Sequence, residues 1–363
     1  MRACQSITNF FVVAIKLVNK LSLHHGHCIV TKRKAEQEFL NVRGEKKTAR
    51  SRTNFWLLLL CAVLGTVMIA LLLPAVCGAA SRSREAEVSA EISQLGQALS
   101  AFKNEHGVFP PDTITIPENG LDWQPADRAN VRRMWPQFRF EGQSDLNHDG
   151  DTDDVHVLNG AECLVFFLGG ARLENGKLTG FWKNPVSPFT DDGANRTGPY
   201  FDFDTERFTD VNNDGFCEYG DTYSSRSSAL NPAPYLYLVQ QHGRFRSKGL
   251  AVYPDNDSRN LQKPYDVRFR SPEYQIISPG FDGEYGVGGE YVEGKTDFTG
   301  DRKVEADNIT SFSPGTLSGE TFATRSNNPI VLLLVIFSPI ALFLFFYLSN
   351  GLFSIRRTIT DSN

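Results

Sequence analysis

The chain has 363 residues and a net charge of only −5, but its charges are segregated along the sequence. Residues 1–54 carry 11 Lys and Arg against 3 Asp and Glu, whereas residues 79–328 carry 24 against 38. An acidic central region repels nucleic acid and attracts divalent cations, so the charge pattern argues against a nucleic-acid-binding protein. The length is sufficient for one sizeable hydrophobic core.

An uncharged apolar run from Leu57 to Val76 is long enough to cross a bilayer. We therefore expect a transmembrane helix over residues 55–78, in contact with membrane lipid. The basic segment before it, residues 1–54, is expected to stay in the cytoplasm, because positive charge favours that side. Two alternatives stay open: translation that begins nearer Val42, and cleavage by a signal peptidase just after the run.

The residues after this run have the pattern of an amphipathic helix. Apolar residues recur at steps of four and three, at Val88, Ile92, Leu95, Leu99 and Phe102. Gly107 and the pair Pro110 and Pro111 then end the pattern. If the apolar run and this segment form one helix, that helix is about 80 Å long.

Three stretches of this region resemble the N-terminal spine of type IV pilin-like proteins, most closely the major pseudopilins of type II secretion systems: Leu71 to Val76, Ser89 to Lys103, and Gly107 to Pro111. The resemblance implies a long helix packed on a small antiparallel sheet. It also implies that the partners are other pilin-like subunits or an inner-membrane secretion platform, contacted through Phe55 and the five apolar residues above. Asn54 and Leu59 replace the Gly and Glu of the family's processing site, so processing and filament entry stay open.

Residues 79–328 are expected to form a pseudopilin-like domain on the periplasmic side of the inner membrane. Residues 112–143 lack a sustained period, which indicates loops. Asn159 is the expected N-cap of a buried helix over Ala161 to Leu168. Strand composition occurs at residues 234–239 and 274–278. The expected fold class is therefore α+β, with long calcium-binding loops.

A second uncharged run, Ile330 to Leu348, predicts a C-terminal transmembrane helix over residues 329–350, followed by a cytoplasmic tail, residues 351–363. Both ends of the chain would then lie on the cytoplasmic side. A filament subunit must leave the membrane, and a second anchor opposes this. The second span therefore favours an alternative role, a membrane-tethered calcium-binding adhesion or scaffold module.

The segment from Asp210 to Asp221 has the clearest pattern of a site. Oxygen-bearing side chains at the first, third, fifth, ninth and twelfth positions, with glycine at the sixth, are typical of the calcium loops of EF-hands and dockerin repeats. The predicted ligands are Asp210, Asn212, Asp214, the carbonyl of Phe216, Glu218 and Asp221. The alternative is a surface turn rich in Asp and Asn.

A second loop, residues 145–154, begins in the same way. Its predicted ligands are Asp145, Asn147, Asp149 and Asp151. The twelfth position holds His156, a poor calcium ligand, so Asp153 or Asp154 would have to substitute through a different wrap. Five carboxylates within these ten residues repel one another, which favours a bound cation.

A third region, Ser278 to Gly289 followed by Glu305 to Ile309, resembles the C-terminal calcium loop of major pseudopilins. The resemblance implies that Asp282 and Asp307 are calcium ligands. Residues 290–304 are inserted between the two parts. A flexible glycine-rich turn is the alternative.

Sequence patterns of catalysis are missing. There is no nucleophile elbow, zinc-protease sequence or phosphate loop. A hydrolytic triad would have to assemble through tertiary contacts, so we predict no enzymatic activity.

Cys163 and Cys217 either pair or remain free thiols. The predicted function is that of a membrane-anchored, pseudopilin-like structural protein whose outer domain is stabilised by Ca²⁺.

Overall fold

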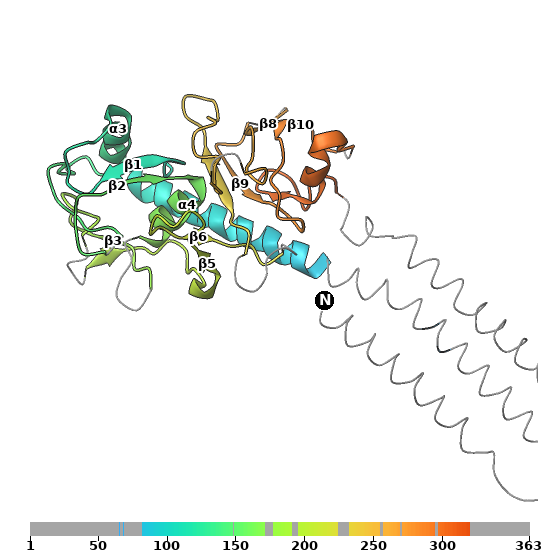
Figure 1. Ribbon diagram of the computed structural model, residues 1–363, viewed down its shortest axis with the longest axis horizontal. Coiled ribbons are helices and arrows are strands. Elements are labelled where there is room, and N and C mark those ends of the chain that lie inside the picture. Colours follow the sequence, from blue (N-terminus) through green and yellow to red (C-terminus); the bar gives the residue numbers. More distant parts are fainter. Residues whose placement is uncertain are drawn as a thin grey trace, which may run out of the picture. The chain divides into compact units, whose positions relative to one another are not determined.

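The computed structural model describes residues 65, 68, 82–147, 149–170, 177–190, 195–223, 232–254, 257–268, 271–294 and 297–319. Apart from residues 65 and 68, all of these belong to a unit that spans Ile69–Asn363. Figure 1 shows its helices and short strands coloured along the sequence. These elements confirm the predicted α+β class.

A helix is described from residue 82 to residue 106 and is called helix 82–106 below. The predicted apolar positions are buried, with exposed fractions of 0% to 3%, at Val88, Ile92, Leu95, Leu99 and Phe102. The helix ends at Gly107, which has a φ of 78° and donates its N–H to the carbonyl of Lys103 over 2.7 Å. The amphipathic helix and its stop are therefore confirmed.

The predicted long transmembrane helix is not confirmed. Within the described residues, no helix combines the length and the apolar character that a membrane crossing requires. The prediction of one helix that joins a membrane span to the amphipathic segment is therefore wrong for this part of the chain. Helix 82–106 exposes charged residues such as Arg84 and Glu87, which suit water and not lipid. The C-terminal span predicted at residues 329–350 lies outside the described residues, as does the segment 55–78 except for Gly65 and Met68.

The other elements are short. In chain order they are β1 (Ile114–Pro117), α3 (Pro125–Met134), β2 (Val155–Leu158), α4 (Gly160–Gly169), β3 (Phe181–Trp182), β4 (Arg196–Thr197), η2 (Thr205–Arg207), β5 (Phe208–Thr209), β6 (Glu218–Tyr219), β7 (Leu236–Val239), β8 (Tyr265–Val267), β9 (Tyr274–Ser278), β10 (Gly289–Tyr291), η3 (Gly300–Asp307) and β11 (Ile309–Thr310).

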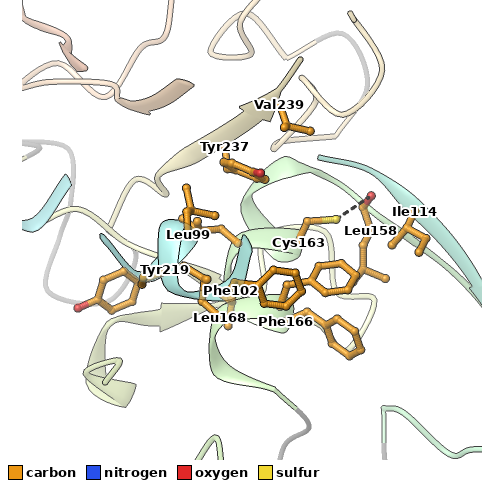
Figure 2. Close-up of a cluster of buried hydrophobic side chains, with 14 of the residues drawn as sticks. Leu99, Phe102, Ile114, Leu158, Cys163, Phe166, Leu168, Tyr219, Tyr237 and Val239 are labelled. Carbon is orange, nitrogen blue, oxygen red and sulfur yellow. Dashed lines mark hydrogen bonds between the residues drawn. The ribbon is translucent and has the colours of Figure 1, made fainter. Parts of the chain in front are cut away.

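A three-stranded antiparallel sheet with the order β11-β9-β7 divides the core into two parts. Side chains alternate between the faces of a strand. Tyr237 and Val239 therefore pack with helix 82–106, whereas Leu236 and Leu238 pack in a second cluster with β8 and β10. Figure 2 shows Tyr237 and Val239 in the same cluster as Phe102. The predicted strands and antiparallel sheet are confirmed, and the parallel pairing of β8 with β10 was not predicted.

Helix α4 is buried on every face, as its apolar sequence predicts. It begins with a capping box: the Asn159 side chain accepts from the N–H of Glu162, and the Glu162 carboxylate accepts from the N–H of Asn159 over 2.7 Å. Cys163 is a free thiol that donates to the carbonyl of Leu158 (Figure 2).

Helix α3 falls in a region that the sequence assigned to loops. Its start carries a conventional signal, because Pro125 occupies the first turn. Only Val131 and Met134 supply buried apolar side chains, which is too few for a recognisable helical period. The helix was missed for that reason.

Asp112 provides a test of the pH dependence of stability. Its buried carboxylate accepts from the N–H of Val239 over 3.2 Å, and burial raises its pKa to about 6. Between the unfolded value near 3.8 and this folded value, the folded state binds a proton that the unfolded state does not. This group therefore adds stability as pH falls from 7 to 4, by up to about 3 kcal/mol.

We expect that Asp112→Asn removes this gain and flattens the pH dependence between pH 4 and 7. The measurement is the free energy of unfolding by denaturant across that range. Asp122→Asn is the matched control, because Asp122 is exposed. Equal pH slopes for the Asp112 variant and the original chain would contradict the expectation.

Candidate metal-binding sites

The hairpin of β5 and β6 carries the loop of residues 210–217, whose aspartates accept from nearby backbone N–H groups. Both the predicted calcium loop and the alternative surface turn have such contacts. Asp210 accepts from the N–H groups of Asp214 and Gly215, over 3.2 and 3.0 Å. Asp214 accepts in turn from the N–H of Phe216 over 2.9 Å. Gly215 has a φ of 90°, which only glycine adopts easily, so the sixth position needs this residue.

Two buried glutamates from outside the turn contact this loop. Glu162, on the first turn of α4, accepts from the side-chain amide of Asn212 over 2.9 Å. Glu218, on β6, accepts from the N–H of Val211 over 3.0 Å through Oε2. Its Oε1 is buried and has no hydrogen-bond partner among the described residues. We call the group of Asp210, Asn212, Asp214, Glu162 and Glu218 the β5–β6 site.

The carboxylates of the β5–β6 site destabilise one another's charge. Burial and then the charge of Glu162 raise the pKa of Glu218 to about 9. Burial and then the charge of Asp214 raise the pKa of Glu162 to about 8. Burial also raises the pKa of Asp214. Like charges in a low-dielectric environment explain these directions, and a divalent cation would offset the repulsion.

Asp221 does not belong to this site, contrary to the prediction for the twelfth position. Its carboxylate is fully buried and accepts from the hydroxyl of Ser278 and the N–H of Tyr223. The chain after Glu218 is extended in β6, so the side chain three residues later is carried toward β9. Glu162 supplies the extra carboxylate instead. Its only signal in the sequence was its place three residues after an N-cap.

The loop of residues 145–154 repeats the same turn. Asp145 accepts from the N–H of Gly150 over 3.1 Å, and Asn147 accepts from the N–H of Asp149 over 3.2 Å. Asp149 accepts from the N–H of Asp151 over 3.1 Å. The predicted ligands Asp145, Asn147, Asp149 and Asp151 are therefore gathered in one turn, as their counterparts are in the β5–β6 site.

The two loops lie against each other. A Cβ atom at Gly215 would stand 3.0 Å from Cβ of Asn147, and the rings of Phe216 and His156 are 4.8 Å apart. A small cavity of about 50 Å³ is lined by residues of both loops and by Glu162. The tertiary fold thus brings together two acidic loops that are about 60 residues apart in the sequence.

The fold also brings together the segments that contain Asp282 and Asp307, the third predicted group of calcium ligands. Asp307, at the end of η3, accepts from the N–H groups of Phe281 and Asp282, over 2.8 and 3.3 Å. The inserted residues 290–304 form part of β10 and η3 and do not keep the two aspartates apart. Asp307 therefore holds the turn at Gly280 to Gly283 directly. Calcium binding by Asp282 and Asp307 stays a prediction.

The residues that were predicted to contact other subunits do not form an exposed surface in the described part of the chain. Phe55 lies outside the described residues. The five apolar residues of helix 82–106 pack inside the hydrophobic core of their own chain. They therefore present no surface to another subunit, because the acidic domain already covers them.

Comparisons with known protein families, with curated proteins and with solved structures found no match. The resemblance to pseudopilins therefore stays a prediction from the residues quoted above.

Proposed function

We propose that this chain is a non-enzymatic structural module whose folded domain is stabilised by calcium at the β5–β6 site. The observation that carries the proposal is the buried Oε1 of Glu218, which has no hydrogen-bond partner among the described residues and belongs to a group of carboxylates that raise one another's pKa. An uncompensated buried carboxylate is costly, and a bound cation removes that cost.

The donor set fits calcium. Asp210, Asp214, Glu162 and Glu218 offer carboxylate oxygens, and hard oxygen ligands in this number suit Ca²⁺. The amide of Asn212 currently donates to Glu162 and Asp214. The two ends of an amide are alike in shape, so a half rotation presents Oδ1 to a cation instead. Mg²⁺ is a poorer fit, because it prefers to keep several of its waters.

The role of the ion would be architectural. The β5–β6 hairpin contributes one side of the site and α4 contributes Glu162, so one cation joins a surface loop to a fully buried helix. An ion that binds only the folded state adds to the free energy of unfolding, by about 4 kcal/mol at a concentration 1,000 times its Kd.

The wider role, anchoring in the inner membrane among pilin-like subunits, rests on the sequence resemblance. The burial of the helix 82–106 stripe favours the alternative, a membrane-tethered adhesion or scaffold module, over contacts made through that stripe. Cell fractionation separates the two: sheared filaments that contain the chain would support the pseudopilin role, and recovery only in membranes would support the scaffold.

Calcium binding is tested by melting the purified full chain with excess Ca²⁺ and with a chelator. We expect the melting temperature to rise with Ca²⁺, and to rise much less in Asp210→Asn, which loses a carboxylate ligand. Asp202→Asn removes an exposed acid outside the loop and is the matched control. A melting temperature that is the same with Ca²⁺ and with chelator would overturn the proposal.

A further inference from the structure

A second group of possible metal ligands lies where the antiparallel ribbon of β1 and β2 meets the 145–154 loop. Ile116 pairs with His156 in this ribbon, and the N–H of Glu118 donates to the carbonyl of Asp154 over 3.0 Å. Residues two apart on a strand share a face, and so do directly paired residues. The register therefore puts the side chains of Glu118, Asp154 and His156 on one face of the ribbon. One oxygen or nitrogen of each lies within 4.8 Å of the others.

Two of these side chains are buried without complete hydrogen bonding. Glu118 is 1% exposed and His156 is 6% exposed. Oε1 of Glu118 accepts from the N–H of Leu146, but Oε2 has no hydrogen-bond partner among the described residues. Nε2 of His156 lies 3.1 Å from Oε1 of Glu118, yet it too makes no hydrogen bond of acceptable geometry in that part of the chain. Buried polar atoms normally have partners, so this arrangement needs an explanation.

The spacing of the donor atoms suits a small cation. An ion with bonds of about 2.0–2.1 Å in tetrahedral geometry separates its ligand atoms by about 3.4 Å. The separation of 3.1 Å between Nε2 of His156 and Oε1 of Glu118 is close to this value. Asp154, which directly precedes β2, supplies the third possible ligand of this group. Because Asp154 is half-buried, the site is open to solvent on that side.

The donor chemistry differs from that of the β5–β6 site. Calcium takes oxygen ligands almost exclusively, whereas an imidazole nitrogen is a characteristic ligand of first-row transition ions. His156 occupies the position at which a calcium loop needs a carboxylate, and this replacement changes the preferred ion.

We propose that Glu118, Asp154 and His156 bind a divalent first-row transition ion, with Zn²⁺ or Mn²⁺ as the best fits to one imidazole and two carboxylates. The ion ties the 145–154 loop to the β1–β2 ribbon. Leu146 already donates its N–H to Oε1 of Glu118, so a metal on the Glu118 carboxylate would hold the same loop. This site does not depend on calcium at the β5–β6 site.

The test titrates Zn²⁺ into the purified, metal-free full chain in the presence of excess Ca²⁺, with a chromophoric chelator as the competitor. The chain has 7 His and 6 Cys in total, so the readout is the difference between variants and the original chain. We expect His156→Gln to remove one bound Zn²⁺ or to weaken it by more than about 100-fold, the upper range for the loss of an outer-shell partner. His242→Asn is the matched control, because His242 is exposed and has a φ of 54°, which asparagine tolerates.

Asp154→Asn is the second variant, since Asp154 is half-buried and its loss endangers folding less. It is expected to weaken the same Zn²⁺ by a comparable factor. Substituting Co²⁺ adds a direct signature, because loss of the nitrogen ligand in His156→Gln changes the visible absorption bands.

Unchanged Zn²⁺ stoichiometry and affinity in both variants would overturn the proposal. Absence of Zn²⁺ binding in the presence of the excess Ca²⁺ would also overturn it, because the site would then prefer Ca²⁺. Asp210→Asn separates the two sites: it should weaken Ca²⁺ and leave this Zn²⁺ in place.

Discussion

Replacing Glu218 with glutamine is expected to change the free energy of unfolding in opposite directions with and without calcium. In metal-free buffer at pH 7 the variant should be more stable by about 1–3 kcal/mol, because folding the original chain must either bury the Glu218 charge or protonate a carboxyl whose pKa is raised to about 9, and glutamine avoids that cost. The glutamine carbonyl can still accept from the N–H of Val211 as Oε2 does now. With Ca²⁺ at 1,000 times its Kd the original chain gains about 4 kcal/mol, and the variant should lose most of this gain.

Glu218 is a better choice for this test than Glu162. The Glu162 carboxylate also accepts from the N–H of Asn159 and so caps α4, which would mix two effects. Chemical denaturation of the full chain, with Ca²⁺ and with chelator, measures both differences. Glu206→Gln is the control, since Glu206 is exposed outside the loop. A calcium response of the Glu218 variant equal to that of the original chain would remove Glu218 from the site.

Replacing Phe102 with alanine is expected to lower the free energy of unfolding by about 3–5 kcal/mol, the usual cost for a fully buried phenylalanine. Its ring meets Tyr200, Phe167 and Trp135 edge-on, with centroid separations of 5.3, 5.9 and 6.5 Å. These three aromatic residues come from different parts of the chain and surround one side chain. The cavity left by alanine cannot collapse easily, because the aromatic neighbours are themselves packed together.

The expected decrease in melting temperature is about 10 °C for a folded unit of this size. Leu121→Ala is the control, because Leu121 is 77% exposed and its loss should change stability by less than about 0.5 kcal/mol. Phe102→Leu should fall between the two. If Phe102→Ala melts like the control, helix 82–106 is not the centre of the hydrophobic core.

Local sequence patterns were sufficient to predict structural features that depend only on residues close together in the sequence. The steps of four and three between Val88 and Phe102 put those side chains on one helix face, and that face is buried. Asn159 was identified as an N-cap from its place before an apolar run. The spacing of Asp210, Asn212 and Asp214 predicted a calcium loop, with a surface turn rich in Asp and Asn as the alternative, and each of these side chains accepts from a nearby backbone N–H.

The sequence by itself therefore determined the amphipathic helix, its stop, the capped helix and the two acidic turns, because each depends on residues within a few positions of one another. Only the tertiary structure decided which carboxylates meet. Strand register joined His156 to Glu118, the packing of α4 joined Glu162 to Asn212, and the extension of β6 carried Asp221 away to Ser278. A metal site needs ligands that converge in space, and such long-range convergence is fixed by strand pairing and helix packing, which leave no mark in the local spacing of residues.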